Sequence, residues 1–167
     1  VGAAENAERF KEHFKELYGR MEWFDERALD SIVQHEVQEE AGRLPDDEEI
    51  RAAVGRLNSS SPGGSGVGAV AVKAAIENER GFALVREMVL DFWEGEVAPA
   101  SWEDGLLKIL PKSGDLSQPG NYRGIMLLEV LYKVIANIIK TRLTPIQGSL
   151  EQESQCGFRP GRGCSDA

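Results

Sequence analysis

Two cationic residues lie close together in a stretch whose pattern brings them to facing strands. Lys112 follows the apolar run 105–111, and Arg123 lies in the run 122–126 that returns toward it. The interval is rich in Gly, Pro, Asp, Asn and Ser, which predicts a β-hairpin with a long loop. A lysine and an arginine on facing strands could clamp a polyphosphate, the lysine as a compact charge and the arginine as a fork for two oxygens. The alternative is an exposed hairpin with ordinary surface charges.

The charge of the chain is distributed unevenly. The 167 residues carry a formal net charge of -9. Residues 1–57 hold 8 basic and 15 acidic side chains and residues 58–104 hold 3 and 8, whereas residues 105–167 hold 8 and 5. Nucleic-acid affinity depends on neutralising phosphates with Lys and Arg, so a nucleotide or nucleic-acid contact is expected after Gly105.

Composition and the chain ends restrict the class of protein. With 41% hydrophobic and 28% charged residues, the chain is typical of a globular protein, and one domain is the default expectation. No stretch approaches the roughly 20 apolar residues of a membrane span, so we expect an intracellular protein, nuclear or cytoplasmic, without a membrane partner. Cys156 and Cys164 lack metal-ligand spacing and are expected to be a reduced pair. The ends at Val1 and Ala167 look cut, so we expect a fragment of a longer protein.

Apolar residues spaced by three and four predict the helices that must position the hairpin. They cover 8–18, 46–57, 82–93 and 127–143, with a short helix near Ala69. A weaker helix is possible within the acidic segment 22–43, through Leu29, Ile32, Val33 and Val37. The 127–143 helix is expected to pack against 82–93 and to end at Pro145, with Lys133, Asn137 and Lys140 on its other face. The expected fold class is α+β, mainly helical with a small β-hairpin.

The 46–57 helix has the clearest beginning. Asp46 can cap it, and Glu49 stands at the spacing of a capping box. Its expected buried stripe is Ile50, Ala53, Val54 and Leu57. The Ser/Pro/Gly run 58–66 then predicts a flexible loop, and the Gly-rich segment 155–163 predicts an exposed one.

The order of several short motifs resembles the first half of a reverse transcriptase of non-LTR (LINE-type) retrotransposons. Asn-Tyr-Arg-Gly-Ile at 121–125, followed by Gly-Phe-Arg-Pro-Gly-Arg at 157–162, is the most specific pair. Leu-Pro-Lys-Ser-Gly-Asp at 110–115 precedes them. The loop 61–67 is similar to an Ala-Pro-Gly-Pro-Asp-Gly-Ile loop of that family. The resemblance runs through about two thirds of the chain.

The resemblance implies the fingers, and the start of the palm, of a right-hand polymerase fold. Residues 1–45 would be a helical connector upstream of the polymerase, and residues 46–167 the fingers region, ending before the catalytic palm motif. Lys112 and Arg123 would contact the triphosphate of the incoming nucleotide. The residues implied in template or nucleic-acid contact are Asn121, Tyr122, Gly157, Phe158, Arg159, Gly161 and Arg162. The alternative for the last five is a Gly/Pro turn whose arginines bind local carbonyls.

The chain also departs from the family pattern, and these departures are as informative as the matches. Ser60, Ser61, Gly64 and Ser65 stand where the family usually has Lys, Ala, Pro and Asp, so we expect a more flexible loop. The family's catalytic aspartates have no counterpart before Ala167, and two-metal phosphoryl transfer needs them. No catalytic or metal-binding residue is therefore expected in this chain. Mg²⁺, RNA template, DNA primer and dNTP would be the cofactor and partners of the complete parent, an RNA-directed DNA polymerase.

The sequence has two other interpretations. Residues 66–71 fit a Gly-x-Gly-x-x-Ala dinucleotide fingerprint, but no buried strand precedes them, and Lys73 lacks the neighbours of a phosphate-binding P-loop. The open alternative is an inactive retroelement relic, or an isolated nucleic-acid-binding or protein-binding module, which the acidic first hundred residues favour. A Phe-x-Asp strand and an Ala-Asp-Asp turn in the downstream reading frame would support the enzyme, and stop codons would support the relic.

Overall fold

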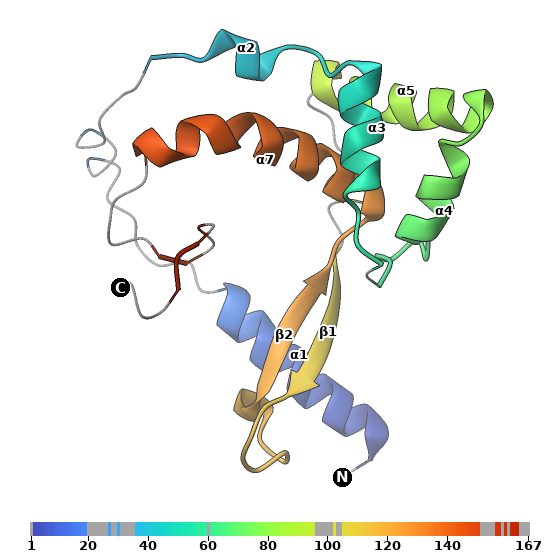
Figure 1. The fold of residues 1–167 in the computed structure, drawn as a ribbon. Coiled ribbons are helices and arrows are strands. Elements are labelled where there is room, and N and C mark those ends of the chain that lie inside the picture. The colour runs from blue at the N-terminus through green and yellow to red at the C-terminus, as the bar shows by residue number, and fades with distance from the viewer. Residues whose placement is uncertain are drawn as a thin grey trace. The chain divides into compact units, whose positions relative to one another are not determined.

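The computed structural model describes residues 2–19, 27, 30, 36–59, 61–95, 102, 105–150, 156, 157, 159 and 161–163. The chain divides into two compact units (Figure 1). The first contains Val1–Val37, Ser61–Gly66 and Pro99–Glu129, and the second contains Gln38–Ser60, Val67–Ala98 and Val130–Ala167. The described elements are mostly helices with one two-stranded antiparallel sheet, which confirms the α+β class. No helix in the described ranges has the length and apolar character that crossing a bilayer requires.

The first unit is built on the predicted hairpin. Strand β1 (Leu106–Pro111) pairs antiparallel with β2 (Tyr122–Leu127), in a register that places Leu106 opposite Leu127 and Pro111 opposite Tyr122. A backbone bond of 2.8 Å from Lys112 N to Asn121 O extends the ladder by one step. A short 3₁₀ helix, η2 (Pro119–Asn121), leads into β2. Both strands lie within one residue of their predicted limits.

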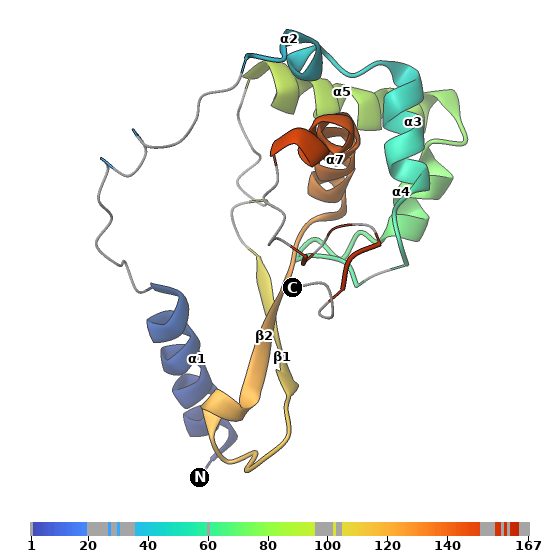
Figure 2. The ribbon, with the colours of Figure 1, turned by 60° about the vertical axis from the view of Figure 1, so that its left-hand side comes forward.

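Helix α1 (Ala3–Gly19) covers one face of this hairpin (Figure 2). The ring of Phe10 meets the ring of Tyr122 edge to face, with centroids 4.7 Å apart. Phe14 is buried and stacks against Tyr18. At Gly124 an added Cβ would lie 2.7 Å from Tyr18 Oη and 3.1 Å from Phe14 Cε1, so the missing side chain lets α1 approach the strand. A lone hairpin is marginal in water, and α1 supplies the apolar partner that it needs.

The loop Ser61–Gly66 in the same unit is tied to Glu129. The Glu129 carboxylate, almost completely buried, accepts hydrogen bonds from the backbone N of Ser65 at 2.8 Å and from the Ser65 hydroxyl. A Cβ on Gly63 would stand 2.7 Å from Glu129 Oε1 and 2.8 Å from Glu129 N. The sequence predicts a flexible loop here, but this carboxylate fixes it, because a buried charge must find donors.

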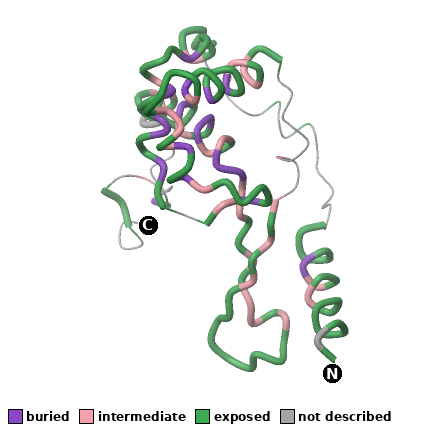
Figure 3. The backbone as a smooth tube through the Cα atoms, turned by 90° about the vertical axis from the view of Figure 1, so that its right-hand side faces the viewer, coloured by how far each residue is buried: buried purple, intermediate pink, exposed green. Residues whose placement is uncertain are grey.

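The second unit is all helical in its described part. It contains α2 (Glu39–Gly42), α3 (Asp47–Gly55), α4 (Ala69–Ala75), α5 (Glu79–Gly95) and α7 (Val130–Leu150). Helix α7 packs against α3 and α5, as the sequence predicted for the 82–93 helix. Buried residues occur along these helices, where the backbone is purple in Figure 3. They include Ile50, Ala53, Val54, Leu57, Val85, Val89, Val134, Ile135 and Ile138.

The predicted start and buried stripe of the 46–57 helix are confirmed. The Asp46 side chain accepts from Glu49 N at 2.9 Å, and the Glu49 carboxylate accepts from Asp46 N at 3.3 Å, which completes the capping box. Ile50, Ala53, Val54 and Leu57 are all buried.

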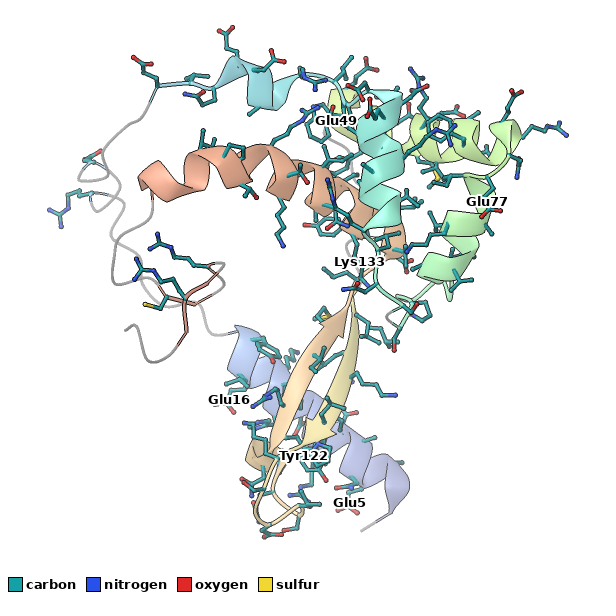
Figure 4. All side chains as sticks on the ribbon, viewed as in Figure 1. Glu5, Glu16, Glu49, Glu77, Tyr122 and Lys133 are labelled. Atoms are coloured by element: carbon teal, nitrogen blue, oxygen red, sulfur yellow. The ribbon has the colours of Figure 1, made fainter. Side chains whose placement is uncertain are left out.

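An arginine that the sequence did not single out joins α7 to the start of α3. Arg142 donates from Nε and Nη2 to the two carboxylate oxygens of Glu49, both at 2.9 Å. Its Nη1 donates to the carbonyls of Ala41 and Arg43. The guanidinium also lies over the Trp93 ring, 4.9 Å from its centroid. The Arg142 side chain is only 8% exposed, and its partner Glu49 is labelled in Figure 4.

Several expectations for the helices were wrong. Helix α7 begins at Val130 and continues through Pro145 to Leu150. Pro145 has no backbone N–H to donate to the carbonyl of Thr141, and its ring crowds that carbonyl, yet the helix continues past it for five residues. Asn137 does not lie on a solvent face, because its side-chain amide donates to Ala53 O at 3.3 Å. Met88 belongs to the apolar spacing that predicts the 82–93 helix, yet it is 41% exposed.

The acidic connection and the C-terminal segment are described only in part. Within 22–43, helix α2 covers Glu39–Gly42 and Val37 is exposed, while Leu29, Ile32 and Val33 lie outside the described residues. In the segment 155–163, Cys156 is buried, so the expectation of a wholly exposed loop is wrong. Cys164 lies outside the described residues.

Candidate functional site

The register of the hairpin decides which side chains share a face. Leu110 pairs with Arg123 and Lys108 pairs with Ile125, and Lys112 bonds to Asn121 one step further on. Because side chains alternate between faces along a strand, these positions point to one side of the ribbon. We call this side the open face, and its residues are Leu106, Lys108, Leu110, Lys112, Asn121, Arg123, Ile125 and Leu127. The opposite side carries Leu107, Ile109, Tyr122, Gly124 and Met126, and it includes the positions that meet α1.

Lys112 and Arg123 therefore lie on the same face of the hairpin, as the clamp requires. They are diagonal neighbours across the two strands, a relation that separates Cα atoms by about 7 Å. Both side chains are exposed. Neither makes an ion pair with another described residue, and the Lys112 ammonium reaches only the carbonyl of Gly120, at 3.4 Å. Both charges thus remain available to an anionic ligand.

The loop between the strands is held by its own hydrogen bonds. Asp115 accepts from the backbone N and the hydroxyl of Ser117, both at 2.8 Å. These bonds, the backbone one first, hold the pKa of the Asp115 carboxyl below its ordinary value. Gly114 adopts φ +110°, a conformation that glycine tolerates and other residues avoid. The loop therefore presents Lys112 from an ordered backbone turn.

Asn121 and Tyr122, predicted to contact template or nucleic acid, take part in this internal structure. The Asn121 amide donates to Asp115 O at 2.8 Å, and the Tyr122 hydroxyl donates to Leu116 O at 3.1 Å. Tyr122 also packs on Phe10, on the side of the hairpin away from the open face (Figure 4). Their contact with nucleic acid stays a prediction, and both have a clear structural role within the unit.

The other predicted contact residues belong to the second unit. Gly161 has φ +73°, and Arg162 N donates to Arg159 O at 3.3 Å, so the segment forms a tight turn at a glycine. Gly157 lies in a turn as well, whereas Phe158 lies outside the described residues. Arg159 is half-buried and Arg162 is exposed. Neither the phosphate-contact role nor the local turn role of the two arginines is tested by this geometry.

Lys108 is a member of the open face that the sequence analysis did not single out. It is exposed, and it makes no ion pair with a described residue. The alternation along β1 contained the necessary information, since Lys108 and Lys112 are four residues apart and must share a face once the strand forms. Arg123 consequently has a lysine as a diagonal neighbour on each side.

The described residues include no cluster of side chains that would ligate a metal ion. They contain no group of three or more His, Cys, Asp or Glu side chains placed to hold one. Asp115, the acid nearest to the clamp in sequence, is engaged by Ser117.

A transposon protein is among the known proteins to which the chain is similar. The similarity is to the "Transposon TX1 uncharacterized 149 kDa protein" of Xenopus laevis, with 37% identity over 71 residues. The matched segment covers 42% of this chain and 5% of the transposon protein, so the chain corresponds to a small part of that protein's length. No family model matches the chain.

Proposed function

We propose that the chain is the fingers segment of an RNA-directed DNA polymerase of a LINE-type retroelement. In this role Lys112 and Arg123 bind the triphosphate of the incoming dNTP. The observation that carries the proposal is the shared exposure of these two cations on the open face. The similarity to a transposon protein supports a retroelement origin.

The chemistry of the clamp follows from the side chains. Arg123 offers a planar fork that matches two oxygens of one phosphate, and Lys112 offers a compact charge to a neighbouring phosphate. On an exposed surface such contacts are screened by salt, so binding by this chain alone should be weak and strongest at low ionic strength. The RNA template, the DNA primer and Mg²⁺ are partners of the complete enzyme in this proposal.

Binding of a base-labelled fluorescent dNTP to the 167-residue chain, followed by anisotropy at low salt, tests the clamp. Arg123→Ala should weaken binding about tenfold, equivalent to about 1.4 kcal/mol. Arg123→Lys keeps the positive charge but lacks the planar fork. Its dNTP affinity should therefore lie between those of the unmodified chain and Arg123→Ala. The matched control is Arg80→Ala, which removes an exposed arginine from α5. Equal effects of Arg123→Ala and Arg80→Ala would refute the clamp.

A second arm uses the complete parent enzyme. There, Arg123→Ala should reduce kcat/KM for the nucleotide much more than it reduces affinity for primer and template. Equal losses in both would contradict the assignment.

A second candidate is a binding module of a retroelement relic, without polymerase activity. The acidity of residues 1–104 favours it, because that part of the chain would repel nucleic acid. Primer extension by the complete parent separates the two candidates: a parent that extends no primer fits the relic.

A further inference from the structure

Helix α1 covers the apolar side of the hairpin, and it also reaches the loop that leads into β2. Its residue Arg9 is exposed and donates from Nη2 to the carbonyl of Ser117 at 3.2 Å, across 108 positions of sequence. The next residue, Phe10, packs edge to face on Tyr122 at the start of β2. Figure 2 shows α1 beside the short helix η2. Two consecutive residues of α1 therefore hold the loop and the strand that follows it.

Ser117 belongs to the hydrogen bonds that shape the loop. Its backbone N and its hydroxyl donate to the Asp115 carboxylate, both at 2.8 Å. The backbone O of Asp115 accepts from the Asn121 amide at 2.8 Å, and Asn121 O accepts from Lys112 N at 2.8 Å. The bonds run without a break from Arg9 to the backbone of Lys112. A change at Arg9 can therefore reach the backbone that presents the lysine of the clamp.

Arg9 approaches the loop from the side of the hairpin that is opposite to the clamp. Helix α1 packs on Tyr122 and Gly124, whereas Lys112 and Arg123 point to the open face. Any effect of Arg9 on the nucleotide must then pass through the loop. A loop that is already held in its binding conformation loses less conformational entropy when a ligand binds, and affinity rises accordingly.

We propose that Arg9 is a positioning residue for the nucleotide clamp, because its bond to Ser117 O holds the loop in the conformation that presents Lys112. The inference rests on the proposed function for the identity of the ligand. Lys108 is a diagonal neighbour of Arg123 just as Lys112 is, but it lies inside β1 and away from this loop. The contribution of Lys112 to binding therefore depends on Arg9, whereas any contribution of Lys108 is independent of it.

The first test is binding of the labelled dNTP to variants of the 167-residue chain at low salt, followed by anisotropy. Arg9→Ala should weaken binding about threefold, equivalent to about 0.7 kcal/mol, which lies within the range of one intramolecular hydrogen bond. Arg9→Lys can still donate to the carbonyl of Ser117, so it should recover part of this loss. Lys15→Ala is the matched control, because it removes an exposed cation from the same helix.

A double-mutant cycle shows which lysine depends on Arg9. In a chain that carries Lys112→Ala, the further change Arg9→Ala should have almost no effect on dNTP affinity. In a chain that carries Lys108→Ala, its effect should remain about threefold. The second test needs no ligand and measures hydrogen exchange of single amides by NMR. Arg9→Ala should speed the exchange of the Lys112 and Asn121 amides, whose hydrogen bonds close the loop.

The inference is overturned if Arg9→Ala and Lys15→Ala change dNTP affinity equally, or if amide exchange in the loop stays as in the unmodified chain. It is also overturned if the effect of Arg9→Ala persists in the Lys112→Ala background, since Arg9 would then attract the nucleotide by its charge alone. Failure of the proposed function looks different. Arg123→Ala then leaves dNTP binding intact, so the clamp and this inference fall together, while Arg9→Ala still speeds amide exchange in the loop.

Discussion

Replacement of Arg142 by alanine should markedly destabilise the helical unit. The guanidinium makes two bonds of 2.9 Å to the Glu49 carboxylate, reaches two backbone carbonyls, and covers the Trp93 ring. The side chain is 8% exposed and that of Glu49 is 24% exposed. Removal of one partner of a buried ion pair costs about 3–5 kcal/mol. Because water reaches part of Glu49 and Arg43 Nη1 also lies 3.1 Å from its carboxylate, we expect the lower end, about 3 kcal/mol.

Urea unfolding followed by far-ultraviolet circular dichroism measures this loss as a lower transition midpoint at unchanged slope. Arg142→Lys keeps the positive charge but cannot form the two parallel bonds of a guanidinium. It should therefore recover less than half of the free energy of unfolding that Arg142→Ala loses. Arg56→Ala is the matched control, because Arg56 also joins α3 to α7, through a 2.8 Å bond to Thr141 Oγ1, but is exposed. It should cost less than about 0.5 kcal/mol. If Arg142→Ala cost no more than Arg56→Ala, the pair would have no net stabilising role.

The remaining predictions concern acid stability and two glycines. Arg142, by its hydrogen bond to the carboxylate, holds the pKa of Glu49 below its ordinary value of 4.5. A depressed pKa contributes stability that is fully present above pH 4.5 and is lost as the pH falls through the lower, folded-state pKa. The urea midpoint should therefore drop on acidification. It should drop less in Glu49→Gln, which has no carboxylate to protonate at this position. Gly63→Ala should destabilise the chain by about 1–3 kcal/mol, because the new methyl group would collide with the backbone of Glu129. Gly64→Ala is the control, since its methyl group would lie 3.6 Å from Glu129 Oε1, the nearest atom. It should be close to neutral in the same unfolding assay. Gly124→Val should separate α1 from the hairpin, seen as faster hydrogen exchange of α1 amides, and unchanged exchange would contradict the packing described.

Local patterns in the sequence were sufficient for the elements that have local causes. The hairpin follows from two apolar runs around a Gly/Pro/Asn-rich interval, and its limits agree with the structure to within one residue. The start of α3 follows from Asp46 and Glu49, whose reciprocal bonds span three residues. The placement of Lys112 and Arg123 on one face also has a local cause, since it depends only on alternation and register.

Contacts between distant residues could not be predicted in the same way. Arg142 and Glu49 are 93 positions apart, and no periodicity in either helix identifies the other as its partner. Asn137 has the type of a solvent-facing residue, yet a carbonyl of α3 accepts its amide. Glu129 anchors a loop 64 positions away, which turned an expected flexible segment into a bound one. In each case tertiary packing overrides the local preference.

The two compact units are interleaved along the chain, and this has a practical consequence for dissecting the protein. Each unit draws on three separate stretches of sequence, so a single cut cannot release either one whole. Deleting residues 1–37, for example, would strip Phe10 and Phe14 from the hairpin and leave its apolar side bare to water. Such a shortened chain would be prone to self-association, and a loss of ligand binding in it would report exposed apolar surface instead of a missing contact residue.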